Sequence, residues 1–303
     1  MHNFTFGPVN SRRFGLSLGI DLSPLKKACN YDCLYCELQS AKPVKEIENP
    51  PSVKEIINEV KNTLSIHKSV EIITITSNGE PTLYPYLDEL VDELNSIKQD
   101  KKLLILSNGS TVCDKSIKQT LEKIDFVKLS LDCASAKCFK KIDRPLKEIN
   151  LKNIIKCMKG FKTTLIIEIL LVKGINDKEE ELKAINKVLQ EIKPNRVDIG
   201  TIDRPPAYNV QKVKEERVIE LSRFITNLPV SLIRKNTPIK KENFTKEEIY
   251  NLLSHRPQSQ FDIDNFFSDK AKNNLEELYR DKKIEKNSIA GSIFYQNIDF
   301  WVK

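Results

Sequence analysis

The sequence of 303 residues has little of what marks membrane, fibrous and secreted proteins. No apolar run approaches the roughly 18–20 residues that a membrane-spanning helix needs, so a spanning protein is excluded. Only nine glycines and 14 prolines are present, which excludes a fibrous or low-complexity chain. Residues 1–15 resemble neither a secretory leader nor an Arg/Ser-rich transit peptide. The seven cysteines are an odd number, which argues against a fully paired secreted framework, so we expect a cytoplasmic protein.

The positive charge of the chain is confined to its first 239 residues. The chain has 49 Lys and Arg against 42 Asp and Glu, a net charge of +7, whereas residues 240–303 contain 11 basic and 11 acidic side chains. Most of the excess is lysine in helix-like stretches such as 54–62 and 178–187, which is typical of solvated helix faces. The alternative is a binding surface for an anionic partner.

Short β-branched or aliphatic runs alternate with longer amphipathic stretches through the first 235 residues. Such repeated units predict a parallel sheet, because parallel neighbours need a crossover connection. About six units would form a partial (β/α)6 TIM-like barrel, with its site at the C-terminal ends of the strands. Ser52 and Asn176–Asp177 are expected to cap helices. The expected strands cover 14–21, 70–76, 103–107, 126–131, 164–172, 197–202 and 229–234, and the expected helices 53–66, 86–99, 114–123, 147–161, 178–192 and 213–226.

The alternating strand and helix pattern ends after the barrel-like part, where a polar, proline-containing linker begins. Two helix-like stretches follow at 244–257 and 268–286, and residues 288–303 fit a short hairpin. Helices followed by a hairpin predict a winged-helix-like α+β module over 240–303, beside a barrel domain over 1–235.

Winged-helix modules often bind DNA, but this one is electrically neutral. It lacks the basic surface that phosphate binding needs. We therefore favour a packing or protein-docking role over contact with nucleic acid, and we expect Trp301 to belong to the core of the module.

Three cysteines, Cys29, Cys33 and Cys36, lie in the loop after the first expected strand, with the spacing C-x3-C-x2-C. Thiolates this close can converge on one centre, and thiolates are the usual ligands of zinc and of iron–sulfur clusters. A structural zinc site needs a fourth cysteine or histidine, and the three histidines of the chain are remote. Three ligands on a four-iron cluster leave one iron open, as a catalytic centre requires. The loop therefore predicts a cluster, with zinc as the alternative.

This cysteine spacing, with Tyr35 before the last cysteine, resembles the C-x3-C-x-aromatic-C motif of the radical S-adenosylmethionine (SAM) superfamily. A second signature of that superfamily, a Gly-Gly-Glu-Pro-like segment, resembles the Asn-Gly-Glu-Pro at 78–81. Polar residues at the ends of the next two expected strands, 107–109 and 130–132, resemble those that line the SAM pocket. The resemblance covers roughly residues 10–235 and predicts a radical SAM enzyme.

The resemblance implies a role for each of these residues. Cys29, Cys33 and Cys36 would bind a [4Fe–4S] cluster whose fourth iron chelates the amino and carboxylate groups of SAM. One electron from an external donor of the flavodoxin or ferredoxin type would release methionine and a 5′-deoxyadenosyl radical, which removes a hydrogen atom from the substrate. The SAM-binding residues would be Tyr35 beside the adenine, Asn78, Gly79, Glu80 and Pro81 at the amino group, and Ser107, Asn108, Ser130 and Asp132 at the carboxylate or ribose.

Residues 7–38, with the Arg-Pro-Pro at 204–206, look like the branch of the superfamily that contains the tRNA wyosine-base synthases. Wyosine-forming enzymes of this type are expected to carry additional N-terminal cysteines for a second cluster. No cysteine precedes Cys29, so the resemblance favours a related activity. An RNA base is slightly favoured as the substrate, and peptides and small molecules are also admissible.

Three further charged positions are candidates on the substrate side. The tetrapeptide Ile-Asp-Arg-Pro occurs twice, around Arg144 and around Arg204. Arg204 follows an expected strand and could clamp an anionic substrate, whereas the alternative for both arginines is a solvated side chain at the end of an element. Glu168 falls inside an apolar strand and needs a partner, either in the site or in a structural pair. Arg13 precedes the first expected strand and should lie away from the cysteine loop.

The remaining cysteines have no tight pair spacing. We expect them to be free and buried, which is the common state of cysteine, and a second cluster is the less favoured alternative. They are Cys113, Cys133, Cys138 and Cys157.

A second class of function is a non-catalytic iron–sulfur or zinc regulator that binds DNA through the C-terminal module. The Asn-Gly-Glu-Pro segment argues against it, because a sensor does not need a site for an amino group. The neutral charge of the module argues against it too.

Overall fold

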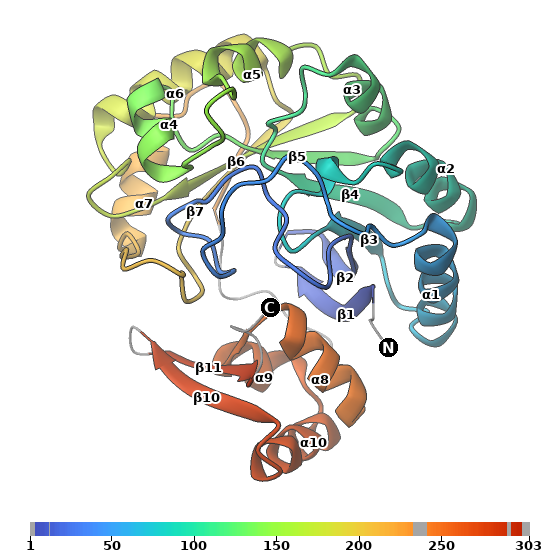
Figure 1. The fold of residues 1–303 in the computed structure, drawn as a ribbon. Coiled ribbons are helices and arrows are strands. Elements are labelled where there is room, and N and C mark those ends of the chain that lie inside the picture. The colour runs from blue at the N-terminus through green and yellow to red at the C-terminus, as the bar shows by residue number, and fades with distance from the viewer. Residues whose placement is uncertain (1–3, 12, 233–240, 290–291, 299–303) are drawn as a thin grey trace.

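The computed structural model describes residues 4–11, 13–232, 241–289 and 292–298, and its larger part is a curved sheet of eight strands (Figure 1). The strands follow one another in chain order across the sheet, and all neighbours from β2 to β8 are parallel. Every expected strand is present, which confirms the predicted α/β partial barrel. The strands are β1 (Thr5–Ser11), β2 (Gly15–Asp21), β3 (Ile72–Thr76), β4 (Lys102–Ser107), β5 (Phe126–Ser130), β6 (Thr164–Leu171), β7 (Arg196–Thr201) and β8 (Val230–Leu232).

Helices connect the strands and lie on the outer side of the curved sheet (Figure 1). A short 3-10 helix, η1 (Pro81–Leu83), follows β3. In the described chain none of the helices is long and apolar enough to cross a membrane. The α-helices of the barrel part are α1 (Val53–Ile66), α2 (Leu87–Ile97), α3 (Lys115–Leu121), α4 (Ala136–Ile142), α5 (Leu151–Cys157), α6 (Glu179–Ile192) and α7 (Glu215–Ser222).

The two faces of the sheet differ in polarity. Alternate strand residues such as Leu18 and Ile73 are buried with the helices in one apolar core, as the period of two in a strand requires. The opposite face carries polar residues, for example Ser17 and Thr74, whose hydroxyls are hydrogen-bonded at 2.7 Å. The interior of the barrel is therefore partly polar and can surround a polar molecule.

Of the two expected helix caps, one is confirmed. Ser52 begins α1 with a capping box, in which Ser52 and Glu55 each bond the backbone of the other. The cap at Asn176–Asp177 is wrong, since α6 begins after Lys178, whose side chain makes no cap bond. Asn176 is instead buried and binds the backbone at the ends of β5 and β6, which a local sequence pattern does not show.

Strand β1 pairs antiparallel with β2 and was not expected from the sequence pattern. Its centre is Gly7-Pro8, and proline removes a donor from a β-ladder, so this sequence argues against a central strand. The structure accommodates the pair at the edge of the sheet, where the register shifts between Phe6 and Val9.

The C-terminal module has the helix–strand order of a winged helix, which confirms the predicted architecture. Its apolar core includes Phe244 and Leu252, and it also takes in Val9 and Leu16 from β1 and β2, so the module packs on the edge of the barrel sheet. The short β9 and α9 were not expected, and Trp301 lies outside the described residues. The elements are α8 (Lys246–His255), β9 (Gln258–Ser259), α9 (Gln260–Phe266), α10 (Asp269–Arg280), β10 (Ile284–Ile289) and β11 (Ser292–Asn297).

Candidate active site

The loop after β2 carries Cys29, Cys33 and Cys36, and none of these cysteines forms a disulfide. Burial, followed by the charge of Glu80, raises the pKa of the Cys29 thiol to about 12. Burial also raises the pKa of Cys33 and of Cys36, and the thiols oppose one another's ionisation. Three thiolates in this place are therefore unfavourable unless a cation joins them. The donor set fits a thiolate-bound metal centre.

The segment after β3 is joined directly to this loop. The Ala28 amide donates to the Asn78 carbonyl at 2.7 Å, and the Glu80 amide donates to the Ala28 carbonyl at 2.8 Å. Gly79 lies between them with a φ of +147°, and a Cβ at this position would lie 1.8 Å from the Ala28 oxygen. Only glycine permits this approach, so Gly79 brings the segment and the cysteine loop together.

Glu80 is buried beneath this junction and ties the end of β3 to the end of β4. Its carboxylate accepts hydrogen bonds from the amide and hydroxyl of Thr82, the hydroxyl of Ser107 and the amide of Asn108, at 2.6–3.0 Å. The first of these caps η1, which Pro81 begins. Burial raises the pKa of Glu80, and these hydrogen bonds oppose the rise. The carboxylate is thus held by the chain's own donors.

Asn108 connects the end of β4 to the cysteine loop. Its side-chain amide donates to the Asn30 side chain at 2.8 Å, and its Nδ2 lies 3.7 Å from the sulfur of Cys29. Asn30 in turn donates to Ser110 at 2.7 Å. The cysteine loop is therefore held by two strand ends, and Asn30 is a residue of this contact that sequence reasoning missed.

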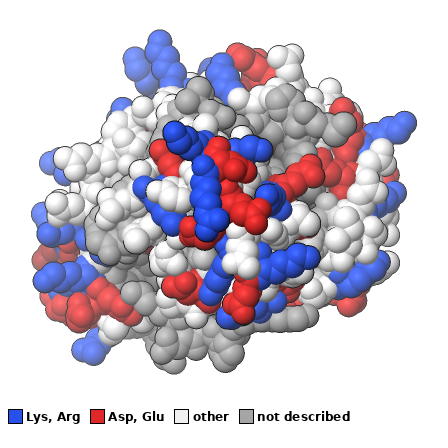
Figure 2. Space-filling model, turned by 90° about the horizontal axis from the view of Figure 1, so that it is seen from below, with Lys and Arg blue, Asp and Glu red and all other residues white. Residues whose placement is uncertain are grey.

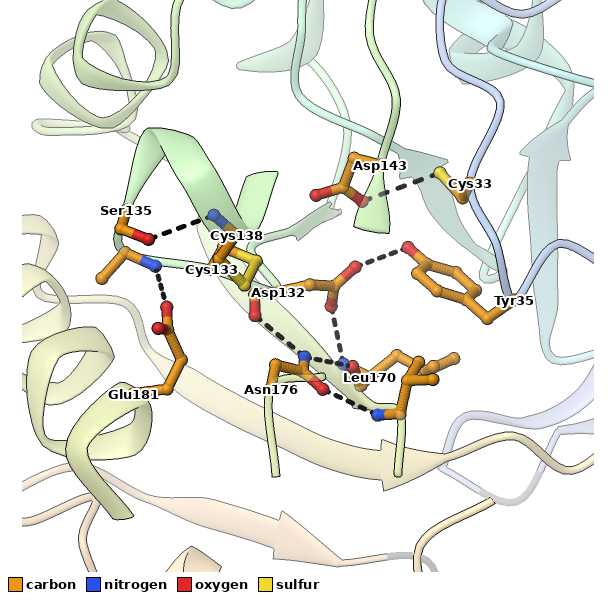
Figure 3. Close-up of a disulfide and its surroundings, with 12 residues drawn as sticks. Cys33, Tyr35, Asp132, Cys133, Ser135, Cys138, Asp143, Leu170, Asn176 and Glu181 are labelled. Atoms are coloured by element: carbon orange, nitrogen blue, oxygen red, sulfur yellow. Dashed lines mark hydrogen bonds between the residues drawn. A yellow bond between two sulfur atoms is a disulfide. The ribbon is translucent and has the colours of Figure 1, made fainter. Parts of the chain in front are cut away.

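The end of β5 makes a third contact with the loop, which Figure 3 shows. The Tyr35 hydroxyl donates to Asp132 at 2.5 Å, and the Leu170 amide donates to the other carboxylate oxygen at 2.7 Å. Burial raises the pKa of Asp132 to about 6, although the Tyr35 hydrogen bond opposes the rise. Burial and the charge of Asp132 raise the pKa of Asp143 well above its ordinary value, and the Cys33 sulfur lies 3.7 Å from its carboxylate.

Three of the predicted SAM-binding residues meet at a small hollow of about 10 Å³. Asn108, Ser130 and Asp132 line it, from the ends of β4 and β5. Tyr31 and Asp143 complete its polar lining. The structure thus brings together residues that are far apart in the sequence and that the strand-end pattern predicted to be neighbours.

Both Ile-Asp-Arg-Pro tetrapeptides pack on the cysteine loop. Arg144 lies 3.1 Å from Asp32 and covers the ring of Tyr208, and Arg204 lies 3.2 Å from Glu37. The Arg204 side chain is 14% exposed, and the nearby carboxylates raise its pKa against the opposing effect of burial. The Arg204 side chain is largely buried, whereas that of Arg144 is 40% exposed beside Asp32. Arg204 thus contacts the loop that carries the cysteines, and the substrate clamp at this residue stays a prediction.

Glu168 has the partner that its place in an apolar strand requires. Lys128 donates to it at 2.5 Å, and Arg13 lies 3.5 Å from the same oxygen. Both cations also contact Asp198, which is fully buried. Arg13 therefore enters the barrel from the β1–β2 hairpin, away from the cysteine loop as expected, and belongs to a buried ion-pair network.

The remaining four cysteines are paired, so the expectation of free thiols is wrong. Cys133 and Cys138 form one disulfide, and Cys113 and Cys157 form another (Figure 3 shows the first). Cys133 follows β5 and Cys138 lies in the first turn of α4, so the chain folds back and brings their Cα atoms within 5.6 Å. The second pair joins the loop before α3 to the end of α5. Helix packing, which spacing does not encode, makes these contacts.

The sequence profile of the Radical SAM superfamily matches residues 24–184 of the chain, just over half of it. The chain therefore belongs to the radical SAM superfamily. It is 40% identical to the UPF0026 protein of Helicobacter pylori (strain ATCC 700392 / 26695) over 296 residues, which cover 96% of both chains. It is also 28% identical over 311 residues to a UPF0026 protein of Methanocaldococcus jannaschii, covering 96% of this chain and 94% of the other. Within the superfamily it thus belongs to the UPF0026 proteins.

Solved structures show the same fold at low sequence identity. A radical SAM methyltransferase from Sphaerobacter thermophilus superposes with a TM-score of 0.58 at 12% identity, covering 71% of this chain and 65% of the other. The protein is accordingly a radical SAM enzyme, whose cofactors are a [4Fe–4S] cluster and SAM and which needs an external reductant.

Proposed function

We propose that Cys29, Cys33 and Cys36 hold the [4Fe–4S] cluster and that SAM binds beside them at the ends of β4 and β5. The observation that carries the proposal is that these three thiols share one loop, have no disulfide partners and are held by three successive strand ends. When bound, the cluster and SAM supply a 5′-deoxyadenosyl radical that removes a hydrogen atom from the substrate. The chain's own task is to position both groups and to exclude water.

The predicted SAM-binding residues divide into two groups by their contacts. Asn108, Ser130 and Asp132 line the hollow, so we assign them direct contacts with SAM. Ser107 and Glu80 are bonded to each other, and Glu80 also to the Asn108 amide, so their role is to fix the geometry of the strand ends. Asn78, Gly79 and Pro81 shape the backbone that would face the SAM amino group, and Tyr35 fixes the side of the site next to Asp132.

The cysteine loop carries an acidic residue directly before Cys33 and another directly after Cys36, and each contacts an arginine. Asp32 meets Arg144, and Glu37 meets Arg204. An ion pair of this kind limits the conformations of the loop. Conformations that separate the two partners are unfavourable, because they leave a charge uncompensated. Arg144 and Arg204 thus hold the cysteines in position for the cluster.

For the substrate we propose an RNA base that enters the barrel interior. The net charge of +7 lies outside residues 240–303, so the barrel part carries the attraction for a polyanion. Inside the barrel, Lys128 and Arg13 both bind Oε1 of Glu168, whose side chain is 37% exposed. A carboxylate held in this way can accept a hydrogen bond from the N–H groups of a base.

The alternative of a DNA-binding regulator is less well supported. Figure 2 shows the molecule from the side of the C-terminal module, and basic and acidic residues are interspersed on this face. Several are paired within the module, such as Lys246 with Glu277 and Lys286 with Glu276. A surface of alternating sign does not provide the basic footprint of a phosphate-binding face.

We also propose a cytoplasmic enzyme with two domains, 1–235 and 240–303, and an electron donor of the flavodoxin or ferredoxin type. Two apolar cores support the division, although β2 contributes to both. A reducing compartment supports the free thiols that a cluster needs.

Anaerobic turnover tests the proposal. The protein is reconstituted with iron and sulfide, reduced with dithionite and incubated with SAM, with and without bulk tRNA, and 5′-deoxyadenosine is quantified. We expect the nucleoside from the wild type and none from the triple variant Cys29→Ala, Cys33→Ala, Cys36→Ala. A variant with the other four cysteines changed to serine is the matched control and should stay active. Iron-loaded protein that forms no nucleoside under either condition would overturn the proposed site.

A further inference from the structure

Asp21, the last residue of β2, joins the two parts of the molecule. Its carboxylate is buried, and Oδ1 accepts hydrogen bonds from the Asn78 amide at 2.8 Å and from the Ser23 amide at 2.9 Å. The Asn78 carbonyl accepts from Ala28, next to Cys29. Asp21 therefore holds the first residue of the Asn-Gly-Glu-Pro segment at the point where that segment meets the cysteine loop.

The other oxygen of Asp21 faces the C-terminal module. Nε2 of His255, the last residue of α8, lies 3.6 Å from Oδ2, and the His255 side chain is 5% exposed. The imidazole stacks on Phe6 of β1 with ring centres 5.1 Å apart and 9° between the ring planes. The contact is thus enclosed between the module, the edge strand and the end of β2.

The two ring nitrogens of His255 have different neighbours. Nδ1 of His255 lies 2.9 Å from the Asn251 carbonyl, and because a carbonyl oxygen only accepts, Nδ1 carries a hydrogen. Nε2 faces Oδ2 of Asp21 at 3.6 Å, which is longer than a hydrogen bond, so the module contacts the same carboxylate that holds Asn78.

The module is also attached to the barrel at other points. His67 at the end of α1 lies 2.8 Å from Glu248, and the Asn251 side chain donates to the Thr5 carbonyl at 2.8 Å. The shared apolar core with Val9 and Leu16 adds to these contacts. We therefore expect the module to stay attached when the His255 contact alone is removed. An effect of such a variant on Asn78 is then not caused by detachment of the module.

We propose that His255 is a positioning residue for the SAM-binding segment and acts through Asp21 on the backbone amide of Asn78. The inference rests on the proposed function of that segment, and it gives the winged-helix-like module a role in the site without contact between the module and nucleic acid. The module contributes to the support of the segment, because the Asp21 carboxylate is contacted by groups from both the barrel part and the module.

Hydrogen exchange of the metal-free protein is the first test, since it needs neither cluster nor activity. We expect a peptide that covers residues 72–84 to exchange about tenfold faster in Asp21→Ala and several-fold faster in His255→Phe, which keeps the ring stack but loses both nitrogens. His255→Gln, which restores a donor toward Asp21, should return the rate toward wild type. His67→Ala is the matched control and should leave this peptide unchanged.

Kinetics of the reconstituted enzyme is the second test. Asp21→Ala should raise the KM for SAM about tenfold and His255→Phe about threefold, with kcat changed less than twofold and iron content unchanged. His67→Ala should keep both parameters. Unchanged exchange and unchanged KM in His255→Phe would overturn this inference, whereas absence of 5′-deoxyadenosine from the wild type would overturn the proposed function and leave the exchange result standing.

Discussion

The carboxylates at the barrel mouth, meaning the strand ends around the cysteine loop, and the carboxylates of the C-terminal module have pKa values shifted in opposite directions. At the mouth, Glu80, Asp132 and Asp143 are buried, and burial raises the pKa of each. In the module, contacts with Lys246 and His67 lower the pKa of Glu277 and of Glu248. Burying acids beside thiols costs free energy, whereas pairing acids with cations near the surface costs little.

The difference shows where the molecule is organised for binding and where it is organised for packing. The mouth brings a loop with three free thiols next to polar strand ends, and some of these strand-end residues line a small hollow. The module contains no cysteine, and its centre is a group of aromatic rings, Phe244, Phe266 and Phe267, with centroids 5.0–6.4 Å apart. Perturbed acids in a hollow therefore mark the site independently of any ligand.

Gly79→Ala should disrupt the structure of the barrel mouth more than the other changes and leave the module intact. The added Cβ would lie 1.8 Å from the Ala28 oxygen, so the segment and the cysteine loop must separate. We expect iron bound after reconstitution to fall by about fivefold or more, because strain of this size displaces a ligand loop. Iron and sulfide analysis per chain measures the effect.

Gly160→Ala is the control for that change. Gly160 also has a positive φ, +71°, but no atom lies within 4 Å of an added Cβ, so the variant carries the backbone strain without the collision. Equal iron loading of the two variants would contradict the role of Gly79 in joining the loops.

Arg204→Ala and Arg144→Ala should loosen the cysteine loop, with the larger effect at Arg204. After Arg144→Ala, the Asp32 carboxylate keeps Lys27 at 3.8 Å and the Tyr208 hydroxyl at 2.5 Å, whereas among the described residues Arg204 is the cation that contacts Glu37. We expect the cluster to be lost to a chelator about fivefold faster in Arg204→Ala and about twofold faster in Arg144→Ala. The decay of visible absorbance gives the rates, and Lys286→Ala in the module should decay like the wild type.

Opposite pH dependences of stability should follow from the opposite pKa shifts. The pKa of Asp132 is raised to about 6, so the stability that its proton provides is present in acid and is lost as the pH rises through 6. The pKa of Glu277 is lowered, so its contribution is present at neutral pH and is lost as the pH falls. Urea midpoints of the metal-free protein at pH 4.5 and 7 measure both.

We expect Asp132→Asn to gain stability relative to wild type between pH 4.5 and 7, and Glu277→Gln to lose a small amount at pH 7. Parallel pH curves for wild type and Asp132→Asn would show that Asp132 has an ordinary pKa and would weaken the contrast between the two regions.

Changing Cys113, Cys133, Cys138 and Cys157 to serine should have the smallest effect. These residues are paired with one another, so iron and sulfide per chain should equal those of the wild type within error. A loss of about half of the iron would instead indicate a second cluster, and the cluster would then no longer depend on the mouth alone.

Much of the barrel could be predicted because its signals are local. Alternating apolar runs predicted every parallel strand, and the strand-end pattern predicted that Asn108, Ser130 and Asp132 meet. The Gly7-Pro8 strand and the short α9 gave no such signal, since their structure depends on packing at the edge of the barrel sheet and within the module. Asp21 and Asp143 were missed for a related reason, because single acidic residues near strand and helix ends are common.

The sequence alone determined the class of enzyme, the three cysteines and the order of the strand ends, because each is written in contiguous residues or in regular periods. The tertiary structure decided which of those residues contact one another. It assigned Glu80 to four donors of the chain, Arg144 and Arg204 to the cysteine loop, and His255 to Asp21. Such pairings join positions up to 234 residues apart, and burial sets their strength, so no local pattern records them.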